Sequence, residues 1–338
     1  MNRPKDISEQ FINADASFFD NGKNFPLVIT PEQKDLTLRE FLKLNQTEIE
    51  QNILIYGGIL FRGFRIDGIE DFESIVQNCY GSLIDYNDRA TPRSQVKGKV
   101  YTATDYPPEQ EIILHNESSF AAKFPMRIFF SCIEAAEKGG ETPIADVRRV
   151  YEQIDPSIRK PFEEKGVLYV RNLAGGPFGF TWQEVYQTQD KAEMERFCTE
   201  SEIDFEWIDE NKVRTKQLRP AVAKHPITGE ILWLNHGTVL NVFAIEPKLQ
   251  RILLKFFKEK DLPNNTYYGD GTSISKDVIE ALRKAYDSAT IAFRWELGDV
   301  LMLDNMLVAH GRKPFSGKRK VVVAMAKPVS WKDLDTSV

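Results

Sequence analysis

The segment 114–120, LHNESSF, places a histidine and a glutamate two residues apart behind an apolar run. In an extended strand, residues i and i+2 point to the same side, so His115 and Glu117 are predicted to face one site while Asn116 faces away. An imidazole and a carboxylate on one strand face can bind a single metal ion. Such a triplet is weak evidence by itself, because short polar triplets occur by chance.

A second pair of strands supplies the remaining candidate ligand. The apolar segment 298–305, GDVLMLDN, leads towards His310, and the segment 318–326, KRKVVVAMA, follows after a Pro-Phe-Ser-Gly turn. This pattern predicts that His310 lies at a strand end. Two imidazoles and one carboxylate are the donor set of a non-haem Fe(II) centre, whose other positions stay open for a cosubstrate and O2.

The chain has four histidines, so few other residues compete for this role. His225 lies in KHPITGE, a turn sequence between two expected strands, and is interpreted as a solvated or turn-capping residue. His236 follows an apolar run in WLNHG. It is a candidate for hydrogen bonding near the cavity, with contact to substrate the less favoured role.

Two further polar residues favour a diacid cosubstrate. Thr142 lies in GGET, and Arg319 heads a strand face that continues with Val321, Val323 and Met325. A diacid that chelates a metal at one end needs a fixed cation and a hydroxyl at its distal carboxylate, and arginine offers a bidentate fork. Arg319 is either a solvated strand end or a carboxylate clamp, and the nearby ligand set favours the clamp.

Four motifs occur in an order that resembles a known family. HNE at 115–117, GGETPIAD at 139–146, WELGDVLMLDN at 295–305 and AHGRKPFSGKRK at 309–320 resemble the taurine dioxygenase (TauD/TfdA-like) family of Fe(II)/2-oxoglutarate-dependent oxygenases. The branch with clavaminate synthase and the syringomycin-type amino acid hydroxylases is the most similar. The resemblance covers residues 50–327.

The resemblance implies both a site and a reaction. It makes His115, Glu117 and His310 the Fe(II) ligands, and Thr142 and Arg319 the partners of the distal 2-oxoglutarate carboxylate. The expected enzyme uses O2 to hydroxylate an unactivated C–H bond of an amino acid or amino-acid-derived substrate, with release of succinate and CO2.

The chain departs from the family pattern at two positions. Sulfonate-binding members carry a second arginine four residues after the cosubstrate arginine, where this chain has Val323. A sulfonate substrate is therefore not expected. Glu117 replaces the more common Asp, as in the clavaminate-type branch, and a carboxylate ligand favours hydroxylation over halogenation.

The substrate contacts are expected on the first ligand strand and the loops around it. Arg312 is predicted to brace its turn through Asp304 or Asp270, and Trp295 to pack beneath the sheet. The candidate substrate residues, each of which has an ordinary structural interpretation as well, are Arg93, Tyr101, Thr104, Asn116, Ser118 and Asn235.

Composition excludes several other classes of protein. The 338 residues are 42% apolar, which is enough for a large core, and a net charge of −6 with one short basic run, 318–320, disfavours nucleic-acid binding. Three isolated cysteines indicate reduced thiols rather than a disulfide framework. With no signal-peptide pattern and no membrane-length apolar run, a soluble cytoplasmic protein is expected.

The predicted fold is mainly β with flanking helices: a double-stranded β-helix, or jelly roll, of the clavaminate synthase-like type with a helical insertion. We expect a single domain over 1–338, with an irregular N-terminal arm at 1–30, the insertion at about 147–290 and a frayed tail at 328–338. Thr37 and Glu40 form a capping box for a helix over 38–52, and a strand over 53–64 follows.

Several alternatives remain open at this stage. The same cofactor chemistry can end in desaturation or cyclisation in natural-product biosynthesis, and the substrate can be free or tethered to a carrier protein. A non-catalytic jelly-roll binding protein is a third hypothesis, disfavoured because a disused site has no physical reason to keep a buried arginine beside metal ligands. The sequence does not fix the oligomeric state.

Overall fold

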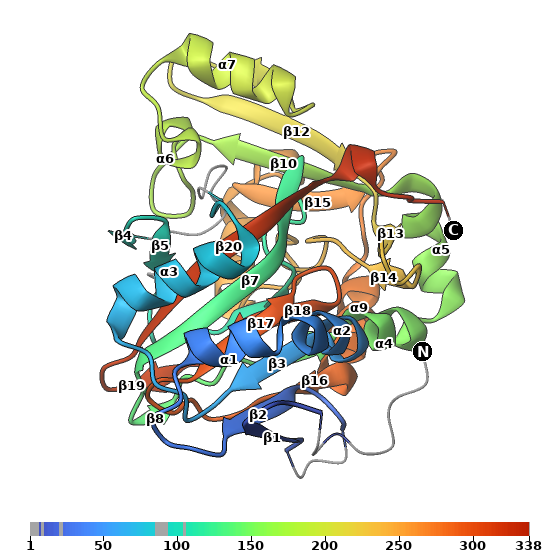
Figure 1. Cartoon of the computed structure of the whole chain (residues 1–338). Helices are drawn as coiled ribbons and strands as arrows, with labels where there is room; N and C mark the ends of the chain where they lie inside the picture. Colours follow the sequence, from blue (N-terminus) through green and yellow to red (C-terminus); the bar gives the residue numbers. More distant parts are fainter. Residues whose placement is uncertain (1–6, 8–9, 20–22, 85–93, 104–105, 338) are drawn as a thin grey trace.

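Two facing sheets form the centre of the computed structural model, which describes residues 7, 10–19, 23–84, 94–103 and 106–337 (Figure 1). The large sheet has the order β1-β2-β3-β17-β7-β20-β5-β4, and the small sheet has the order β16-β9-β18-β6. The strands of the large sheet are β1 (Ala14–Ser17), β2 (Leu27–Pro31), β3 (Gly58–Phe61), β4 (Gln95–Lys97), β5 (Val100–Thr102), β7 (Lys123–Glu134), β17 (Val300–Asp304) and β20 (Lys320–Ser330). Those of the small sheet are β6 (Ile112–His115), β9 (Ile144–Asp146), β16 (Thr290–Ile291) and β18 (Val308–Arg312), and a short pair, β8 (Lys138–Gly139) with β19 (Phe315–Ser316), lies apart.

Strand β20 divides the hydrophobic core into two layers. Its residues Val321, Val323 and Met325 belong to one buried cluster, which also contains residues of the small sheet. The intervening Val322 and Ala324 belong to a second cluster on the other face. The alternation predicted for Val321, Val323 and Met325 is therefore confirmed, and it sets which side chains can face the site between the sheets. Arg319 does not share this strand face, because β20 begins at Lys320 and its pairing shifts register before Val321.

Helices cover the outer face of the large sheet (Figure 1). The capping box of Thr37 and Glu40 is confirmed, but the predicted helix 38–52 is interrupted at Asn45. The Asn45 side chain accepts a hydrogen bond from the Ile12 amide at 2.7 Å and donates one to the Ile12 carbonyl at 3.2 Å. The strand expected from residue 53 begins only at Gly58, since the second helix continues to Tyr56. The helices are α1 (Leu38–Leu44), α2 (Gln46–Tyr56) and α3 (Gly68–Tyr80).

The N-terminal segment is not the irregular arm that the sequence suggested. Strand β1 pairs with β2, and β2 adds to β3 in parallel, so this segment extends the large sheet. Phe11, Ala14 and Leu27 are buried in the core beneath the helices. The prediction was wrong because the strands are only four and five residues long and the Asn, Asp and Gly residues around them resemble a loop in composition.

The tail is ordered further than predicted. Strand β20 extends to Ser330 and a short helical turn, η2 (Trp331–Asp333), follows. The Trp331 indole donates to the Ser119 carbonyl at 2.9 Å, and the Lys224 amide donates to the Asp335 carbonyl at 2.7 Å. The C-terminal tail therefore packs against the turn that follows His115 and Glu117.

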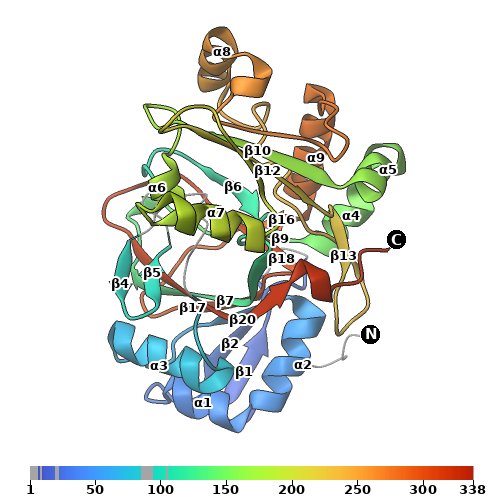
Figure 2. The same cartoon turned by 90° about the horizontal axis from the view of Figure 1, so that it is seen from above.

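The insertion is only partly helical, because it contains a four-stranded sheet of its own with the order β11-β12-β10-β15, of which Figure 2 labels β10 and β12. No helix in the part of the chain that the structure describes is long and apolar enough to cross a membrane. The insertion strands are β10 (Val167–Leu173), β11 (Asp204–Trp207), β12 (Val213–Arg219), β13 (Val222–Lys224), β14 (Ile231–Trp233) and β15 (Asn264–Tyr268). Its helices are α4 (Val147–Gln153), α5 (Pro156–Lys165), α6 (Trp182–Tyr186), α7 (Lys191–Glu200), α8 (Pro247–Phe256), the short η1 (Glu259–Asp261) and α9 (Lys276–Ala289).

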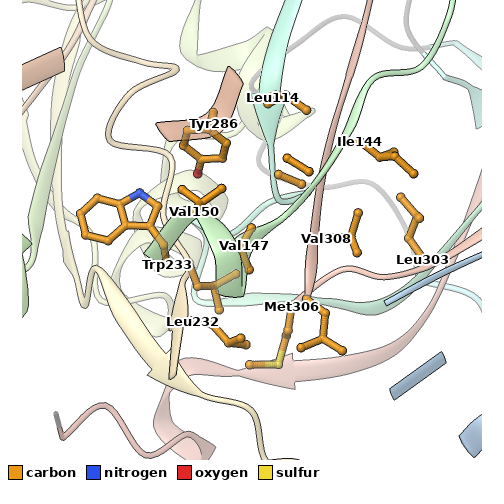
Figure 3. Packing of buried hydrophobic residues seen from close by; sticks show 14 of the residues in the cluster. Leu114, Ile144, Val147, Val150, Leu232, Trp233, Tyr286, Leu303, Met306 and Val308 are labelled. Atoms are coloured by element: carbon orange, nitrogen blue, oxygen red, sulfur yellow. The ribbon is translucent and has the colours of Figure 1, made fainter. Parts of the chain in front are cut away.

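The insertion and the jelly roll share one buried cluster. Figure 3 shows Trp233 of β14 and Tyr286 of α9 packed close to Val147 of α4, with Ile144 and Val308 of the small sheet further along the same layer. Continuous burial of this kind fixes the position of the insertion relative to the small sheet. The insertion can therefore present side chains to a site at the edge of that sheet.

Candidate metal centre

Three side chains that the sequence singled out meet at the small sheet. His115 of β6 and His310 of β18 are directly paired in the strand register, and their ring centroids lie 4.5 Å apart. The Glu117 Oε2 atom lies 3.6 Å from the His310 Nε2 atom and 4.0 Å from the His115 Nε2 atom. One possible ligand atom from each residue lies within 4.8 Å of the others, so the three could hold one metal ion.

A hydrogen bond fixes which nitrogen His115 offers to the site. Its Nδ1 atom lies 2.8 Å from the Ile113 carbonyl oxygen, which can only accept. Nδ1 therefore carries the hydrogen, and the Nε2 lone pair faces Glu117. This arrangement of a ligating imidazole and a main-chain carbonyl is common around protein-bound metals.

Glu117 is placed differently from the prediction. Strand β6 ends at His115, and Glu117 lies in the turn after it. The Asn305 side chain holds this turn: it accepts from the Glu117 amide at 2.7 Å and donates to the Glu117 carbonyl at 3.0 Å. Asn116 faces away, as predicted, and donates to the Asn305 carbonyl at 2.7 Å. Its amide nitrogen thus supports the turn.

Arg319 immediately precedes β20 and is half-buried. Arg319 donates through Nε to the Gly140 carbonyl at 2.9 Å, and its guanidinium lies 5.6 Å from the centre of the Phe315 ring. Burial, with a smaller contribution from Arg312, lowers the pKa of Arg319 to about 10, so the guanidinium is charged at neutral pH. A Cβ atom at Gly140, which has φ +73°, would lie 3.0 Å from the Arg319 Cδ, so glycine leaves the arginine its space.

Thr142 is oriented by a residue that the sequence placed only in the core. The Trp295 indole nitrogen donates to the Thr142 Oγ1 atom at 3.0 Å, and both residues are buried. Because that oxygen already accepts a hydrogen bond, the hydroxyl hydrogen can be donated elsewhere. Trp295 therefore does more than pack beneath the sheet.

The remaining substrate candidates are dispersed. Tyr101 is buried on β5 opposite Val323, and Ser118 has a positive φ of 54° in the turn after Glu117. Asn235 donates to the Ala221 carbonyl at 3.0 Å and accepts from the Gly237 amide at 2.8 Å, which indicates a structural role. Arg93 and Thr104 lie outside the described residues.

Two predicted pairings are wrong. Arg312 donates to the carbonyls of Tyr106 at 2.8 Å and Gln110 at 2.7 Å, while Asp304 pairs with Arg127 and Asp270 with Lys165. Arg312 thus braces the segment before β6 by donating to main-chain carbonyls of that segment. Side-chain charges in the sequence do not reveal such contacts.

His225 is not solvated but 1% exposed. Its Nδ1 atom accepts from the amides of Ile227 and Thr228, so the turn-capping interpretation is confirmed, and its Nε2 atom lies 3.2 Å from Asp304. The contact with the buried Asp304 carboxylate stabilises His225 in the protein interior.

His236 is brought closer to the site than the sequence indicated. Its ring centroid lies 5.4 Å from that of His115, and its Nδ1 atom lies 2.7 Å from the Ser119 hydroxyl. Burial holds the pKa of His236 well below its usual value, so the ring is neutral near pH 7. The apolar run before WLNHG was the only signal for this position.

Comparison with known proteins decides the family. A model of the "Taurine catabolism dioxygenase TauD, TfdA family" matches residues 23–325. The chain belongs to the TauD/TfdA family. The dapdiamide synthesis protein DdaC of Enterobacter agglomerans is 38% identical over 302 residues, which cover 89% of this chain and 91% of that protein. A clavaminate synthase-like protein of Arabidopsis thaliana is 29% identical over 322 residues, covering 90% and 94%.

Solved structures agree with the fold. PvcB from Pseudomonas aeruginosa aligns with a TM-score of 0.58 at 14% identity, covering 100% of this chain and 98% of that one. AAD-2, solved with Mn(II) and N-oxalylglycine, aligns with a TM-score of 0.53 at 14% identity, covering 93% and 97%.

The predicted family, jelly-roll fold and cofactor class are confirmed. The TauD/TfdA chain is an Fe(II)/2-oxoglutarate-dependent dioxygenase that uses O2 and acts on a small molecule. The hypothesis of a non-catalytic binding protein is thereby set aside.

Proposed function

We propose that this dioxygenase binds Fe(II) through His115, Glu117 and His310 and hydroxylates an amino acid or amino-acid-derived substrate in natural-product biosynthesis. The convergence of three ligand atoms within 4.8 Å of one another carries this proposal. Two neutral imidazoles and one carboxylate leave a net positive metal, and they occupy one side of it. Fe(II) bound there supplies O2 activation, and the protein supplies binding and orientation.

The distal carboxylate of 2-oxoglutarate is assigned to Arg319 and Thr142. Arg319 is half-buried, charged and held by the Gly140 carbonyl, while Thr142 keeps a hydroxyl hydrogen to donate. A charge-assisted bond and a hydroxyl bond together orient a diacid whose other end chelates the metal. The reaction consumes one O2 and one 2-oxoglutarate, placing one oxygen atom in succinate and the other in the hydroxyl product, with release of CO2.

The pathway assignment is supported by a relative. DdaC, at 38% identity, is described as a dapdiamide synthesis protein, and dapdiamide synthesis is a natural-product pathway. The substrate is proposed to have its α-carboxylate masked or held away from β20, because Val323 is fully buried where sulfonate-binding relatives carry a second arginine. A carrier-protein thioester of an amino acid fits this best, and a free amino acid held by Arg93 or another loop arginine is the alternative.

The ligand assignment is tested by mixing the protein with Fe(II) and 2-oxoglutarate without O2. The wild type should show a weak visible charge-transfer band from keto-acid chelation. His115→Ala and His310→Ala should remove the band while their circular dichroism spectra stay unchanged. Normal iron binding and turnover in either folded variant would refute the assignment.

The substrate assignment is tested by competition between a free amino acid and its carrier-bound thioester at equal concentration. Succinate and product mass are followed together. Efficient turnover of the free form alone would contradict tethering, and a raised KM in Arg93→Ala would then locate the carboxylate. Product mass also separates hydroxylation, which adds one oxygen, from desaturation or cyclisation, which removes two hydrogens.

A further inference from the structure

The apolar stripe of helix α8 extends beyond the protein core. Leu249, Ile252, Leu253 and Phe256 occupy positions i, i+3, i+4 and i+7, which share one face of a helix. Leu253 packs in a small buried cluster, whereas Phe256 is 70% exposed. Of the ten residues of α8 only Leu253 is buried, and Figure 2 shows the helix at the outer edge of the molecule. The end of this stripe is therefore uncovered.

A second segment adds an aromatic ring beside the uncovered end of α8. Phe178, from the glycine-rich loop 174–180, is 39% exposed. Its ring meets that of Phe257 edge-on, with centroids 6.4 Å apart. Large apolar side chains that gather at an exposed position mark interaction sites more often than single exposed ones do.

The charges of α8 contrast with those of the whole chain. The helix carries Lys248, Arg251 and Lys255 and no acidic residue, although the net charge of the protein is −6. Their spacing of three and four residues places the three cations on one face, together with Leu254, which is 44% exposed. None of the three forms a salt bridge with another residue in the part of the chain that the structure describes.

These residues form one surface at the edge of the insertion. We call Phe178, Arg251, Leu254, Lys255 and Phe256 the α8 surface. It combines exposed apolar side chains with cations that have no acidic partner among the described residues. A basic and apolar surface of this kind is complementary to an acidic and apolar one.

The α8 surface has a fixed position relative to the candidate metal centre. The segment that joins His236 to α8 is braced on β15, where the Asn241 side chain donates to the Thr266 carbonyl at 3.2 Å. Gln250 of α8 donates to the Val242 carbonyl of the same segment at 3.2 Å. A molecule bound at α8 is therefore held at a defined place on the insertion, which also brings His236 to the site.

The charge and packing of α8 favour an acidic protein as the occupant. A second copy of this chain that docked through the same helix would bring like charges together, which is unfavourable. An anionic membrane suits a helix whose whole apolar face is free, whereas Leu253 on that face is packed in a protein cluster. An acidic protein can pair with the cations and cover the exposed rings.

We propose that the α8 surface docks an acidic carrier-protein domain, which presents a thioester-bound amino acid to the candidate metal centre. This inference rests on the proposed function and names its partner. Carrier-protein domains are small helical bundles with acidic surfaces, and they hold the substrate on a long flexible arm. Phe256 is the aromatic anchor of the contact, and Arg251 and Lys255 set the charge that attracts the partner.

The test uses the full-length protein loaded anaerobically with Fe(II) and 2-oxoglutarate. The probes are aminoacyl N-acetylcysteamine thioesters and a panel of acidic carrier-protein domains loaded with the same amino acids. One variant is Phe256→Ser, and another combines Arg251→Glu with Lys255→Glu. Leu297→Ser, at a 77% exposed leucine of the jelly roll, and Lys284→Glu, at an exposed lysine of α9, are the matched controls.

The wild type should bind a loaded carrier with a Kd that rises as NaCl is added, because salt screens the charge contacts. Phe256→Ser and the double charge reversal should each raise that Kd at least about tenfold. The charge-transfer band, the Tm and the turnover of the small thioesters should stay unchanged in both. The two control variants should bind the carrier as the wild type does.

The outcomes separate the two proposals. A wild-type protein without the charge-transfer band contradicts the proposed function itself. An intact band with no binding to any loaded carrier, or with carrier affinity that the α8 variants leave unchanged, would overturn the docking proposal. A dimer that Phe256→Ser dissociates in light scattering would make α8 a self-association surface, and binding to phosphatidylglycerol vesicles that Phe256→Ser abolishes would make it a membrane contact. Either result, in place of carrier binding, would also overturn the proposal.

Discussion

The jelly roll and the insertion differ in how completely their strands are buried. Strands β17 and β18 are buried along their whole length, whereas β12 of the insertion alternates between buried and partly or fully exposed residues. The insertion sheet also leaves large apolar residues such as Leu218 half exposed. A strand that is packed on both faces tolerates few amino-acid substitutions, whereas a sheet with one solvent-exposed face tolerates more.

This difference indicates separate roles for the jelly roll and the insertion. The proposed iron and 2-oxoglutarate residues all come from the jelly roll and its turns, where packing holds side chains in one position. His236, whose ring lies 5.4 Å from that of His115, comes from the insertion. We therefore expect changes in the jelly roll to abolish cofactor binding, and changes in the insertion to alter substrate preference with cofactor binding intact.

The largest effect should follow the loss of the Glu117 carboxylate. Glu117→Ala removes the anionic member of the three proposed protein ligands, and several kcal/mol of lost charge stabilisation corresponds to a fall in turnover on the order of a thousandfold. The measurement is 2-oxoglutarate-dependent succinate release under saturating Fe(II). Turnover within tenfold of the wild type would break the assignment of cofactor binding to the jelly roll.

The next effect concerns the charged cluster beneath the site. Burial alone would raise the pKa of the Asp304 carboxyl, but Arg127 and His225 hold it below its usual value of 3.8. The ionised form therefore contributes stability above that pH, and the contribution is lost as pH falls through the lower folded-state pKa. Asp304→Asn leaves Arg127 buried without this partner and should destabilise the fold by about 3–5 kcal/mol at pH 7.

Thermal unfolding at several pH values checks this prediction. The difference in Tm between wild type and Asp304→Asn should be large at neutral pH and shrink below pH 4. Equal Tm values at neutral pH would mean that the cluster does not stabilise the jelly roll.

The third prediction separates Arg319 from an ordinary strand-end arginine. Arg319→Ala leaves the distal carboxylate unpaired, and a loss of about 2–5 kcal/mol implies a rise in the 2-oxoglutarate KM of about 30-fold or more. Arg319→Lys should recover only part, because an ammonium lacks the bidentate fork. An unchanged KM in the alanine variant would make Arg319 merely structural.

The smallest effect should come from Thr142. Thr142→Val keeps the shape but removes the hydroxyl that Trp295 orients, so the 2-oxoglutarate KM should rise by about two- to tenfold, the range for a single hydrogen bond. Substrate KM should not change, because the hydroxyl belongs to the jelly-roll side. A change in the substrate KM alone would mean that Thr142 contributes to substrate binding and not to 2-oxoglutarate binding.

The sequence predicted the jelly roll better than the insertion. His115, Glu117, His310 and Arg319 lie in local patterns of strand, turn and charge, and such patterns survive in the linear sequence. Asn305 was not foreseen as the support of Glu117, since its 188-residue separation from that turn is closed only by folding.

The contacts of the insertion were largely missed for the same reason. His236 reaches the site because Tyr169 and Ser119 hold it, and neither contact is local in sequence. The N-terminal strands were missed because two segments of only four and five residues gain their β-structure from sheet pairing rather than from a strong pattern of their own.

The most direct test of the division between jelly roll and insertion is an anaerobic crystal structure with Fe(II) and 2-oxoglutarate, measured at the iron absorption edge. We predict one anomalous peak bonded to His115 Nε2, Glu117 and His310 Nε2, with the distal carboxylate of 2-oxoglutarate at Arg319 and Thr142. Iron bonded to His236 in place of one of these ligands would contradict the division.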